Sequence, residues 1–286
     1  MTRPLNADLH CHSTVSDGTL SPEVLARRAK TQGVELWALT DHDELSGQER
    51  ARQMALSLGL SYLTGVEISV SFASETVHIV GLGFALEAKP LVEGLAFIRS
   101  GRERRARDVS DRLAKVGIRG AYEGALRYVG NPDLISRTHF ARYLVEIGAC
   151  RDISEVFRMY LGDGKPGFVP HRWASLREAV EWITQAGGIA VIAHPARYHF
   201  TPSEEYALFS EFKVHGGRGV EVVTGNHSAA DVVRYADMAR EFGLLASRGS
   251  DFHSPDENRV DLGGLPALPG QLTPVWEVLV DRVQHP

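Results

Sequence analysis

The sequence has few cysteines and no long apolar run. Cys11 and Cys150 are the only cysteines among 286 residues, which excludes a disulfide framework, and the lack of any C-x-x-C pair excludes a cysteine zinc site. No stretch approaches the roughly 18 consecutive apolar residues of a membrane span, and the N-terminus lacks the apolar run of a signal peptide. We therefore expect a cytoplasmic protein without a membrane partner, whose metal chemistry would use nitrogen and oxygen ligands.

The chain also carries little excess charge. Its 31 Lys+Arg and 36 Asp+Glu leave a net charge of −5 with histidine neutral, which argues against a general nucleic-acid coat and a DNA-specific partner. The G-x-S-x-G motif of serine esterases and the phosphate-cradling P-loop are both missing, which disfavours serine-esterase and nucleotide-kinase chemistry. Histidine, in contrast, is abundant, with 12 residues.

Short β-rich segments alternate with capped helical patterns, which predicts an α/β fold of parallel strands joined by crossover helices. Ser21 followed by Pro22 indicates one helix start, and a capping box from Ser46 to Glu49 indicates another. Later helix starts are expected at 175–178, 228 and 273–274. The expected strands cover residues 7–12, 35–40, 61–70, 76–83, 188–193, 219–223 and 244–247.

This alternation is interrupted in the middle of the chain. Four helical patterns follow one another there without a convincing strand, at 91–116, 122–129, 138–147 and 153–160. We therefore predict a helical insertion over 90–167, within a barrel-sized α/β domain formed by 1–89 and 168–286.

Histidines and carboxylates gather at the ends of the expected strands. His10 and His12 are two apart, so their side chains leave the same face of a strand. The other candidates are Asp17, His42, Glu67, His78, His194, Asp251 and His253. Each has an ordinary structural explanation, such as a turn at Asp17 or a core position at His78. Because the carboxyl ends of parallel strands meet on one face, the nine together predict a divalent-metal site instead.

The motifs that contain these residues resemble those of the polymerase and histidinol phosphatase (PHP) family. They are Asp8-Leu9-His10-Cys11-His12-Ser13, Asp17-Gly18, Thr40-Asp41-His42-Asp43, Gly65-Val66-Glu67, His78, Ala193-His194-Pro195 and Gly249-Ser250-Asp251-Phe252-His253. The resemblance implies a distorted (β/α)7 barrel of PHP type, with the helical segment as an inserted domain, and three divalent metal ions.

The resemblance also implies a set of ligands for each ion. One ion would be held by His10, His12, Glu67 and Asp251, a second by Glu67, His78 and His194, and a third by Asp17, His42 and His253. Because some relatives have histidine where this chain has Asp17, the extra carboxylate favours a hard ion, so we expect Mn²⁺, with Zn²⁺ or Fe²⁺ as alternatives. Glu67, Asp17 and His253 are the expected catalytic residues, around a hydroxide shared between two metals that attacks phosphorus.

Arginines are concentrated in the expected insertion. Arg102 and Arg105 share one helix face, and a solvated basic surface is the ordinary explanation. A helix start at Ser136, a glycine-rich loop holding Lys165, and Arg197 three residues after His194 favour phosphate binding instead. In an acidic chain, this local basicity predicts a substrate with more than one phosphate.

The middle segment from Asn131 to Gly167 is similar to one branch of the PHP family. That branch contains 3',5'-nucleotide bisphosphate phosphatases and 5'-3' exoribonucleases. The resemblance implies removal of the 3'-phosphate of nucleoside 3',5'-bisphosphates, such as adenosine 3',5'-bisphosphate to AMP, or degradation of short 5'-phosphorylated RNA. The implied phosphate-binding residues are Arg102, Arg105, Ser136, Arg137, His139, Lys165 and Arg197.

Two other functions remain open from the sequence. A histidinol-phosphate phosphatase would share the metal motifs, but a small monophosphate does not need the arginine-rich segment. A non-catalytic, metal-stabilised accessory module is the third alternative, although shared ligands suit turnover better than a structural site. The oligomeric state is left open.

Overall fold

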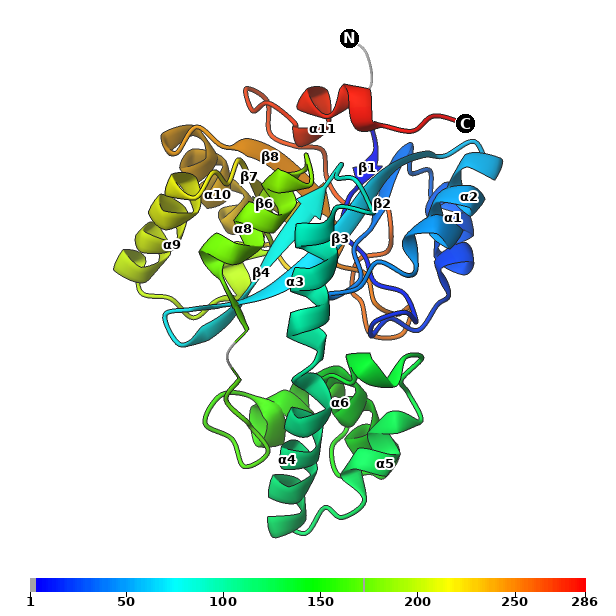
Figure 1. Cartoon of the computed structure of the whole chain (residues 1–286), viewed down its shortest axis with the longest axis vertical. Coiled ribbons are helices and arrows are strands. Elements are labelled where there is room, and N and C mark those ends of the chain that lie inside the picture. The colour runs from blue at the N-terminus through cyan, green and yellow to red at the C-terminus, as the bar shows by residue number, and fades with distance from the viewer. Residues whose placement is uncertain (1–3, 172) are drawn as a thin grey trace.

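The computed structural model describes residues 4–171 and 173–286 (Figure 1). Its sheet has the order β1-β2-β3-β4-β6-β7-β8, and β5 pairs with β3 beside this path. The strands are β1 (Ala7–Asp8), β2 (Leu36–Leu39), β3 (Ser61–Phe72), β4 (Glu75–Leu82), β5 (Ala174–Ser175), β6 (Ile189–Ile192), β7 (Gly219–Thr224) and β8 (Leu245–Gly249). The Leu9 N–H donates to the Arg248 carbonyl across 3.1 Å, which brings β8 back to β1 and nearly closes a seven-stranded barrel.

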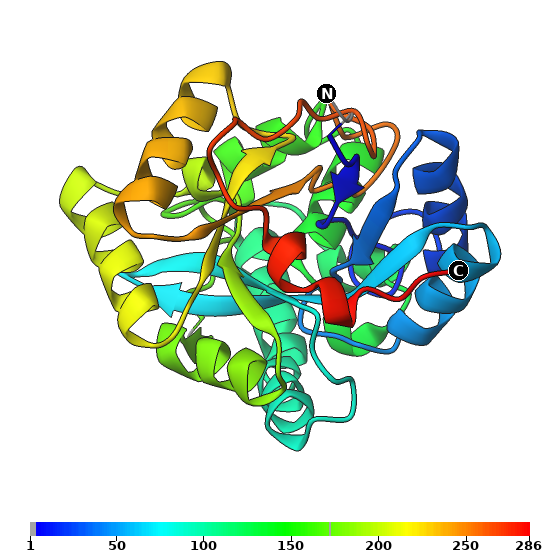
Figure 2. The ribbon, with the colours of Figure 1, turned by 90° about the horizontal axis from the view of Figure 1, so that it is seen from above.

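Helices cover the outside of this barrel, and Figure 2 shows the strands end-on with helices around them. These helices are α1 (Pro22–Thr31), α2 (Gln48–Ser57), α8 (Leu176–Gln185), α9 (Pro202–Val214) and α10 (Ala229–Glu241). Ser21 caps α1, and a capping box at Ser175 starts α8, both as expected. In β2 the side chains alternate: Leu36 packs in the barrel interior, whereas Trp37 packs against the layer of α1 and α2.

One end of the barrel is filled by apolar side chains. The interior cluster includes Leu9, Leu63 and Val191, together with Val275 and Leu279 from the C-terminal segment. That segment forms only the short helix α11 (Val275–Val278) and a 3₁₀ turn at Val280–Arg282, which is less helix than the sequence indicates. In Figure 2, α11 lies across the barrel end. These apolar side chains close that end of the barrel.

The prediction of parallel strands throughout is wrong for β4. It pairs antiparallel with both β3 and β6. The turn from β3 to β4 consists of Ala73 and Ser74, whose φ values of 45° and 67° are those of a tight hairpin turn. Because β4 runs the other way, its early residue His78 lies at the edge where the parallel strands end.

Two further local predictions are wrong because tertiary contacts override them. Ser46 does not start a capping box: Gly47 precedes α2, and the Glu44 carboxylate accepts the Ser46 N–H across 3.0 Å. The single helix expected over 91–116 is divided into α3 (Lys89–Arg99) and α4 (Arg102–Lys115). A Cβ on Gly101, between these helices, would lie 2.8 Å from His171, so the chain bends where a glycine permits close approach.

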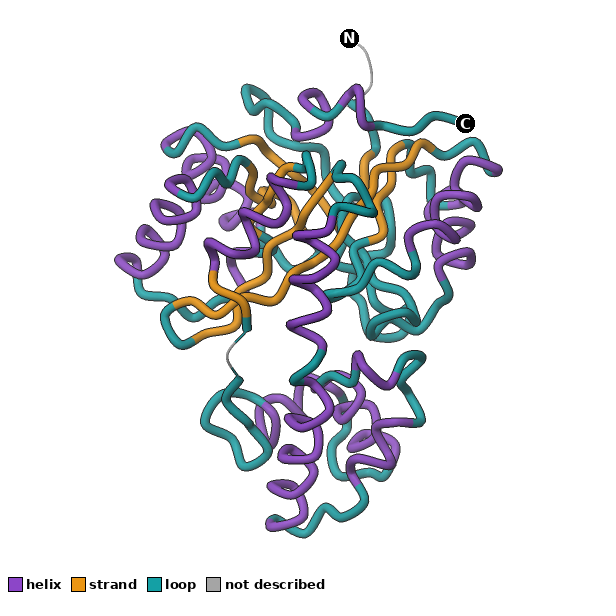
Figure 3. Tube along the Cα trace, viewed as in Figure 1, coloured by secondary structure: helices purple, strands orange, loops and turns teal. Residues whose placement is uncertain are grey.

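Only helices and loops occupy residues 89–171. α3 packs against the outside of the barrel, where Leu91, Leu95 and Ile98 join the cluster of β3, β4 and α8, whereas α4 and the helices after it lie at the end of the barrel opposite α11 (Figures 1 and 3). After α3 and α4 come α5 (Ala121–Leu126), α6 (Arg137–Glu146), α7 (Ile153–Val156) and a π-helical turn at Phe157–Leu161. The segments from α4 onward share a hydrophobic cluster of their own that includes Leu113, Phe140 and Leu144. The division into a barrel and an inserted domain stays a prediction. Among the described residues, no helix combines the length and apolar character needed to cross a bilayer.

Candidate metal centre

The nine residues expected to bind metal meet at the polar end of the barrel. Each comes from a strand or from the loop that follows one. His10, His12 and Asp17 follow β1, His42 follows β2, Glu67 lies in β3, His78 in β4, His194 after β6, and Asp251 and His253 after β8.

Glu67 lies at the centre of this group and is fully buried. Its Oε1 lies 2.9 Å from His194 Nε2, 3.0 Å from His78 Nδ1 and 3.2 Å from His10 Nε2. Its Oε2 lies 2.9 Å from His42 Nδ1 and 3.2 Å from His12 Nε2. One carboxylate therefore contacts five imidazoles, a position suited to bridging two cations.

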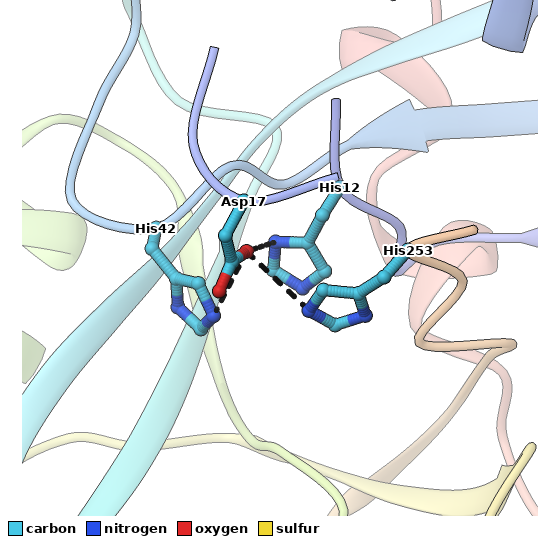
Figure 4. A group of neighbouring side chains, drawn as sticks. All are labelled: His12, Asp17, His42 and His253. Atoms are coloured by element: carbon cyan, nitrogen blue, oxygen red, sulfur yellow. Dashed lines mark ion pairs between the residues drawn. The ribbon is translucent and has the colours of Figure 1, made fainter. Parts of the chain in front are cut away.

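A second carboxylate, Asp17, gathers three of the rings (Figure 4). Its Oδ1 lies 3.4 Å from His253 Nε2, 3.7 Å from His42 Nε2 and 4.0 Å from His12 Nδ1. The third carboxylate, Asp251, has its Oδ1 3.3 Å from His12 Nε2. His12 thus lies near three carboxylates and His42 between two, so these rings are shared more widely than in the ligand sets implied by resemblance.

Several buried polar atoms of this cluster lack hydrogen-bond partners, which suits the binding of cations. Six buried nitrogen or oxygen atoms of the nine residues have no hydrogen-bond partner: His12 Nδ1, Asp17 Oδ1, His42 Nδ1, Glu67 Oε2, His194 Nδ1 and Asp251 Oδ1. Buried polar atoms without partners are costly, and divalent cations would satisfy them. The nine residues form four overlapping groups of three or four, and within each group the ligand atoms all lie within 4.8 Å of one another. The donor set therefore suits several divalent ions.

The protonation states also fit ligands. Burial raises the pKa of Glu67, but the surrounding histidines outweigh it and hold that pKa well below its usual range. Burial, and then Arg197, lowers the pKa of His194 to about 3, and burial lowers that of His253 to about 4. His12 differs: burial opposes its charge, but the adjacent Asp251 and Glu67 carboxylates raise its pKa to about 10. A cation would compete there with a proton.

Sequence reasoning missed the residues that hold these ligands in place. Glu221 of β7 is buried, and its Oε1 lies 2.8 Å from His10 Nδ1. Asp41 accepts hydrogen bonds from Ser13 N–H and from the Ser16 hydroxyl, at 2.7 and 2.6 Å, and so fixes the turn before Asp17. A carboxylate within an otherwise apolar strand was the available signal for Glu221.

Four of the seven residues expected to bind phosphate line one small cavity beside the metal centre: Arg102, Arg105, Ser136 and Arg137. Burial, then repulsion from Arg137 and Arg102, lowers the pKa of Arg105 to about 9, as expected for cations with too few anions near them. Arg102 is already paired with the Asp43 carboxylate. The Ser136 hydroxyl donates to Asp17 Oδ2 across 3.3 Å, which joins this cavity to the metal centre.

The other three residues are placed differently. His139 is fully buried, its Nδ1 accepts the Ser136 N–H across 3.0 Å, and burial lowers its pKa to about 4. The Nδ1 of this ring caps α6, whereas its buried Nε2 has no hydrogen-bond partner, so phosphate contact by His139 stays a prediction. Lys165 is exposed in its loop. Arg197 is half exposed, and its Nη1 donates to Asp251 Oδ2 across 2.6 Å.

A large groove of about 1280 Å³ also leads away from the centre. Its inner end is formed by Arg197, Asn226, Asp251 and His253, and its walls come from α6, α7 and the loop after β8. The Arg142 guanidinium crosses between these walls and donates twice to Glu257, both times across 2.8 Å. The groove exceeds the roughly 300–1000 Å³ of a typical small-molecule pocket.

Comparison with known proteins assigns the chain to a family. The PHP domain family model matches residues 8–186. A 3',5'-nucleoside bisphosphate phosphatase of Chromobacterium violaceum is 48% identical over 281 residues, which cover 98% of this chain and 99% of the relative. A 5'-3' exoribonuclease of Haemophilus influenzae is 42% identical over 270 residues, covering 94% and 97%. The chain belongs to the PHP family and is a phosphoric ester hydrolase, as the sequence led us to expect.

Solved structures agree on the fold. An amidohydrolase from Chromobacterium violaceum, solved with bound sulfate and no metal, has a TM-score of 0.95 at 48% identity, with 98% of each chain covered. A putative metal-dependent phosphoesterase from Bifidobacterium adolescentis has a TM-score of 0.82 at 25% identity, again with 98% of each chain covered. The expected distorted barrel is therefore confirmed.

Proposed function

We propose that this chain hydrolyses the 3'-phosphate of nucleoside 3',5'-bisphosphates, such as adenosine 3',5'-bisphosphate to AMP. The observation that carries this proposal is the position of the carboxylate and imidazole cluster, which opens between a cavity lined by arginines and a wide groove. A substrate with two phosphates can offer one to each feature. The name of the Chromobacterium violaceum relative supports the same substrate class.

The nine residues of the centre would hold three divalent ions, which we propose to be Mn²⁺, with Zn²⁺ or Fe²⁺ as alternatives. The ligand sets follow the resemblance, with Glu67 bridging two ions, and with Asp17 and His253 binding the third. Divalent ions bound there lower the pKa of water and neutralise charge on the phosphoryl oxygens. The chain itself then needs no nucleophilic side chain.

The protein's own groups would orient the substrate. Arg105 and Arg137 bind the 5'-phosphate, because each presents a planar fork matched to phosphate oxygens. Ser136 lies between this cavity and Asp17, so its hydroxyl is placed to contact the same phosphate. Arg102 supports them through its pairing with Asp43. Arg197, which is half exposed beside Asp251, and Lys165 on its loop would contact the scissile end and the outer edge of the substrate.

A second activity, 5' to 3' degradation of short 5'-phosphorylated RNA, is favoured by the groove. Its volume leaves room for nucleotides beyond the scissile phosphate, and the Haemophilus influenzae relative is named for that reaction. Both reactions use the same 5'-phosphate anchor and cleave at the 3' position. We propose that the protein acts in the cytoplasm, where its two buried, free cysteines would stay reduced.

One comparison of substrates tests the proposal. Manganese-loaded protein is assayed against adenosine 3',5'-bisphosphate, a short 5'-phosphorylated RNA and histidinol phosphate, with release of phosphate and of nucleotide measured separately. We expect the highest kcat/KM on one of the two nucleotide substrates. Fastest turnover of histidinol phosphate would refute the nucleotide assignment, and no turnover of any substrate would favour the accessory module.

A further inference from the structure

Among the residues that the structure describes, Glu221 is the one buried carboxylate that contacts two of the proposed metal ligands without belonging to the set. It lies in β7 between Val220 and Val222, and 1% of it is exposed. Its two oxygens serve different strands. Oε1 lies 2.8 Å from His10 Nδ1, and Oε2 accepts the backbone N–H of His194 across 2.6 Å. Both oxygens are therefore used, which compensates for the cost of burying the charge.

The local backbone directs Glu221 inward. In the pairing of β7 with β8, Glu221 faces Ser247, whereas Val223, two residues later, faces Arg248, the very next residue. This is a β-bulge, and bulges beside active sites re-aim side chains. The strand is distorted where the carboxylate must reach both β1 and β6.

We propose that Glu221 is a positioning residue, which fixes the orientation of His10 and His194 for metal binding. An ionised carboxylate can only accept, so the His10 Nδ1 must carry the proton, and its Nε2 lone pair faces the centre, 3.2 Å from Glu67 Oε1. His194 has φ 28° and ψ 57°, in the left-handed region that non-glycine residues rarely adopt. The hydrogen bond to Glu221 holds that turn, which aims His194 Nε2 at Glu67.

Glu221→Gln tests this inference, which rests on the proposed metal centre. The amide has the same shape, but it cannot accept from both partners, because one of its two terminal atoms is a donor. Either the His10 tautomer reverses or the His194 N–H loses its acceptor. We expect apparent Mn²⁺ affinity, measured by chelator competition on metal-stripped protein, to fall ~10- to 100-fold. Excess Mn²⁺ should restore most of the activity.

Glu205→Gln is the matched control. Glu205 is also buried, where it accepts from the Tyr235 hydroxyl across 2.8 Å, but it lies on α9 away from the centre. We expect this variant to lose stability and keep its Mn²⁺ affinity. Wild-type Mn²⁺ affinity in Glu221→Gln would overturn the inference alone. A wild-type protein that binds none of Mn²⁺, Zn²⁺ and Fe²⁺ would overturn the proposed function as well.

The tautomer of the His10 ring can also be measured in the wild-type protein, so this test does not depend on whether a variant folds. In zinc-loaded, ¹⁵N-labelled protein, we expect the His10 ring to carry its proton on Nδ1, with Nε2 bound to metal. A ring protonated on Nε2 would overturn the inference, because the hydrogen bond to Glu221 would then not set the ligand atom.

Discussion

Arg137 offers the most direct test of how the protein recognises its substrate. In the structure its guanidinium makes only weak polar contacts: Nη1 lies 3.3 Å from the Leu161 carbonyl and 3.8 Å from Asp163 Oδ1. It also packs near the rings of Phe157 and Phe168, 5.7 and 5.8 Å from their centres. The guanidinium is thus held in place but not neutralised, as a phosphate ligand requires.

Arg137→Met keeps much of the packing and removes the charge. A charge-assisted hydrogen bond contributes roughly 1.5–3 kcal/mol, so the loss of one contact to a 5'-phosphate should raise KM roughly 10- to 150-fold. The maximal rate should change little, because the reacting phosphate lies at the metal centre. The assay compares adenosine 3',5'-bisphosphate with adenosine 3'-monophosphate, which lacks the anchor.

The second substrate and a second variant make the result decisive. Adenosine 3'-monophosphate should be hydrolysed by Arg137→Met at almost the wild-type kcat/KM. Arg127→Met is the control, since this exposed arginine pairs with Glu146 outside the cavity; it should leave both substrates unaffected. If Arg137→Met lost kcat/KM equally on the two substrates, Arg137 would not read the 5'-phosphate.

Three further outcomes are expected. Glu67→Gln should lower kcat by at least ~10³-fold and reduce bound Mn²⁺ in elemental analysis while the circular dichroism spectrum is retained, and full activity would refute the bridging role. Chelation should lower the unfolding midpoint, because each ion at about 1000 times its Kd contributes roughly 4 kcal/mol; an unchanged midpoint would contradict tight binding. Burial lowers the pKa of His139 from 6.5 to about 4. Between these pH values the folded state binds fewer protons than the unfolded state, so the free energy of unfolding decreases as the pH falls, by at most about 3 kcal/mol. In metal-stripped protein, His139→Gln should therefore lose less unfolding free energy than wild type between pH 7 and pH 4.5, and an equal loss would show that His139 titrates normally.

The nine candidate ligands could be located from the sequence because each lies beside a β-rich run. Strand periodicity places His10 and His12 on one face, and parallel topology brings strand ends together. His78 fitted this pattern for a different reason, since β4 is antiparallel and its early residues reach the same edge. The location of His78 was correct, but the topology behind it was not.

Other features depend on contacts between distant segments, which local patterns do not carry. The division between α3 and α4 coincides with Arg99 and Arg102 both contacting Asp43, more than 50 residues earlier in the chain. A histidine at a helix start is a residue type suited to phosphate binding, but the ring of His139 caps its own helix. Glu221 does not lie close in the sequence to any proposed ligand, so only the closed barrel brings it to His10.

The apolar filling at the α11 end has a consequence for how such a protein can change. Side chains such as Val275 and Leu279 are buried there, while the candidate metal centre, the arginine-lined cavity and the groove lie at the other end. Substitutions at sites far apart, without shared partners, contribute almost additively. Thermal tolerance can therefore be adjusted through α11 and the barrel floor, while substrate choice is altered independently in the helical segment, so the two properties need not evolve at each other's expense.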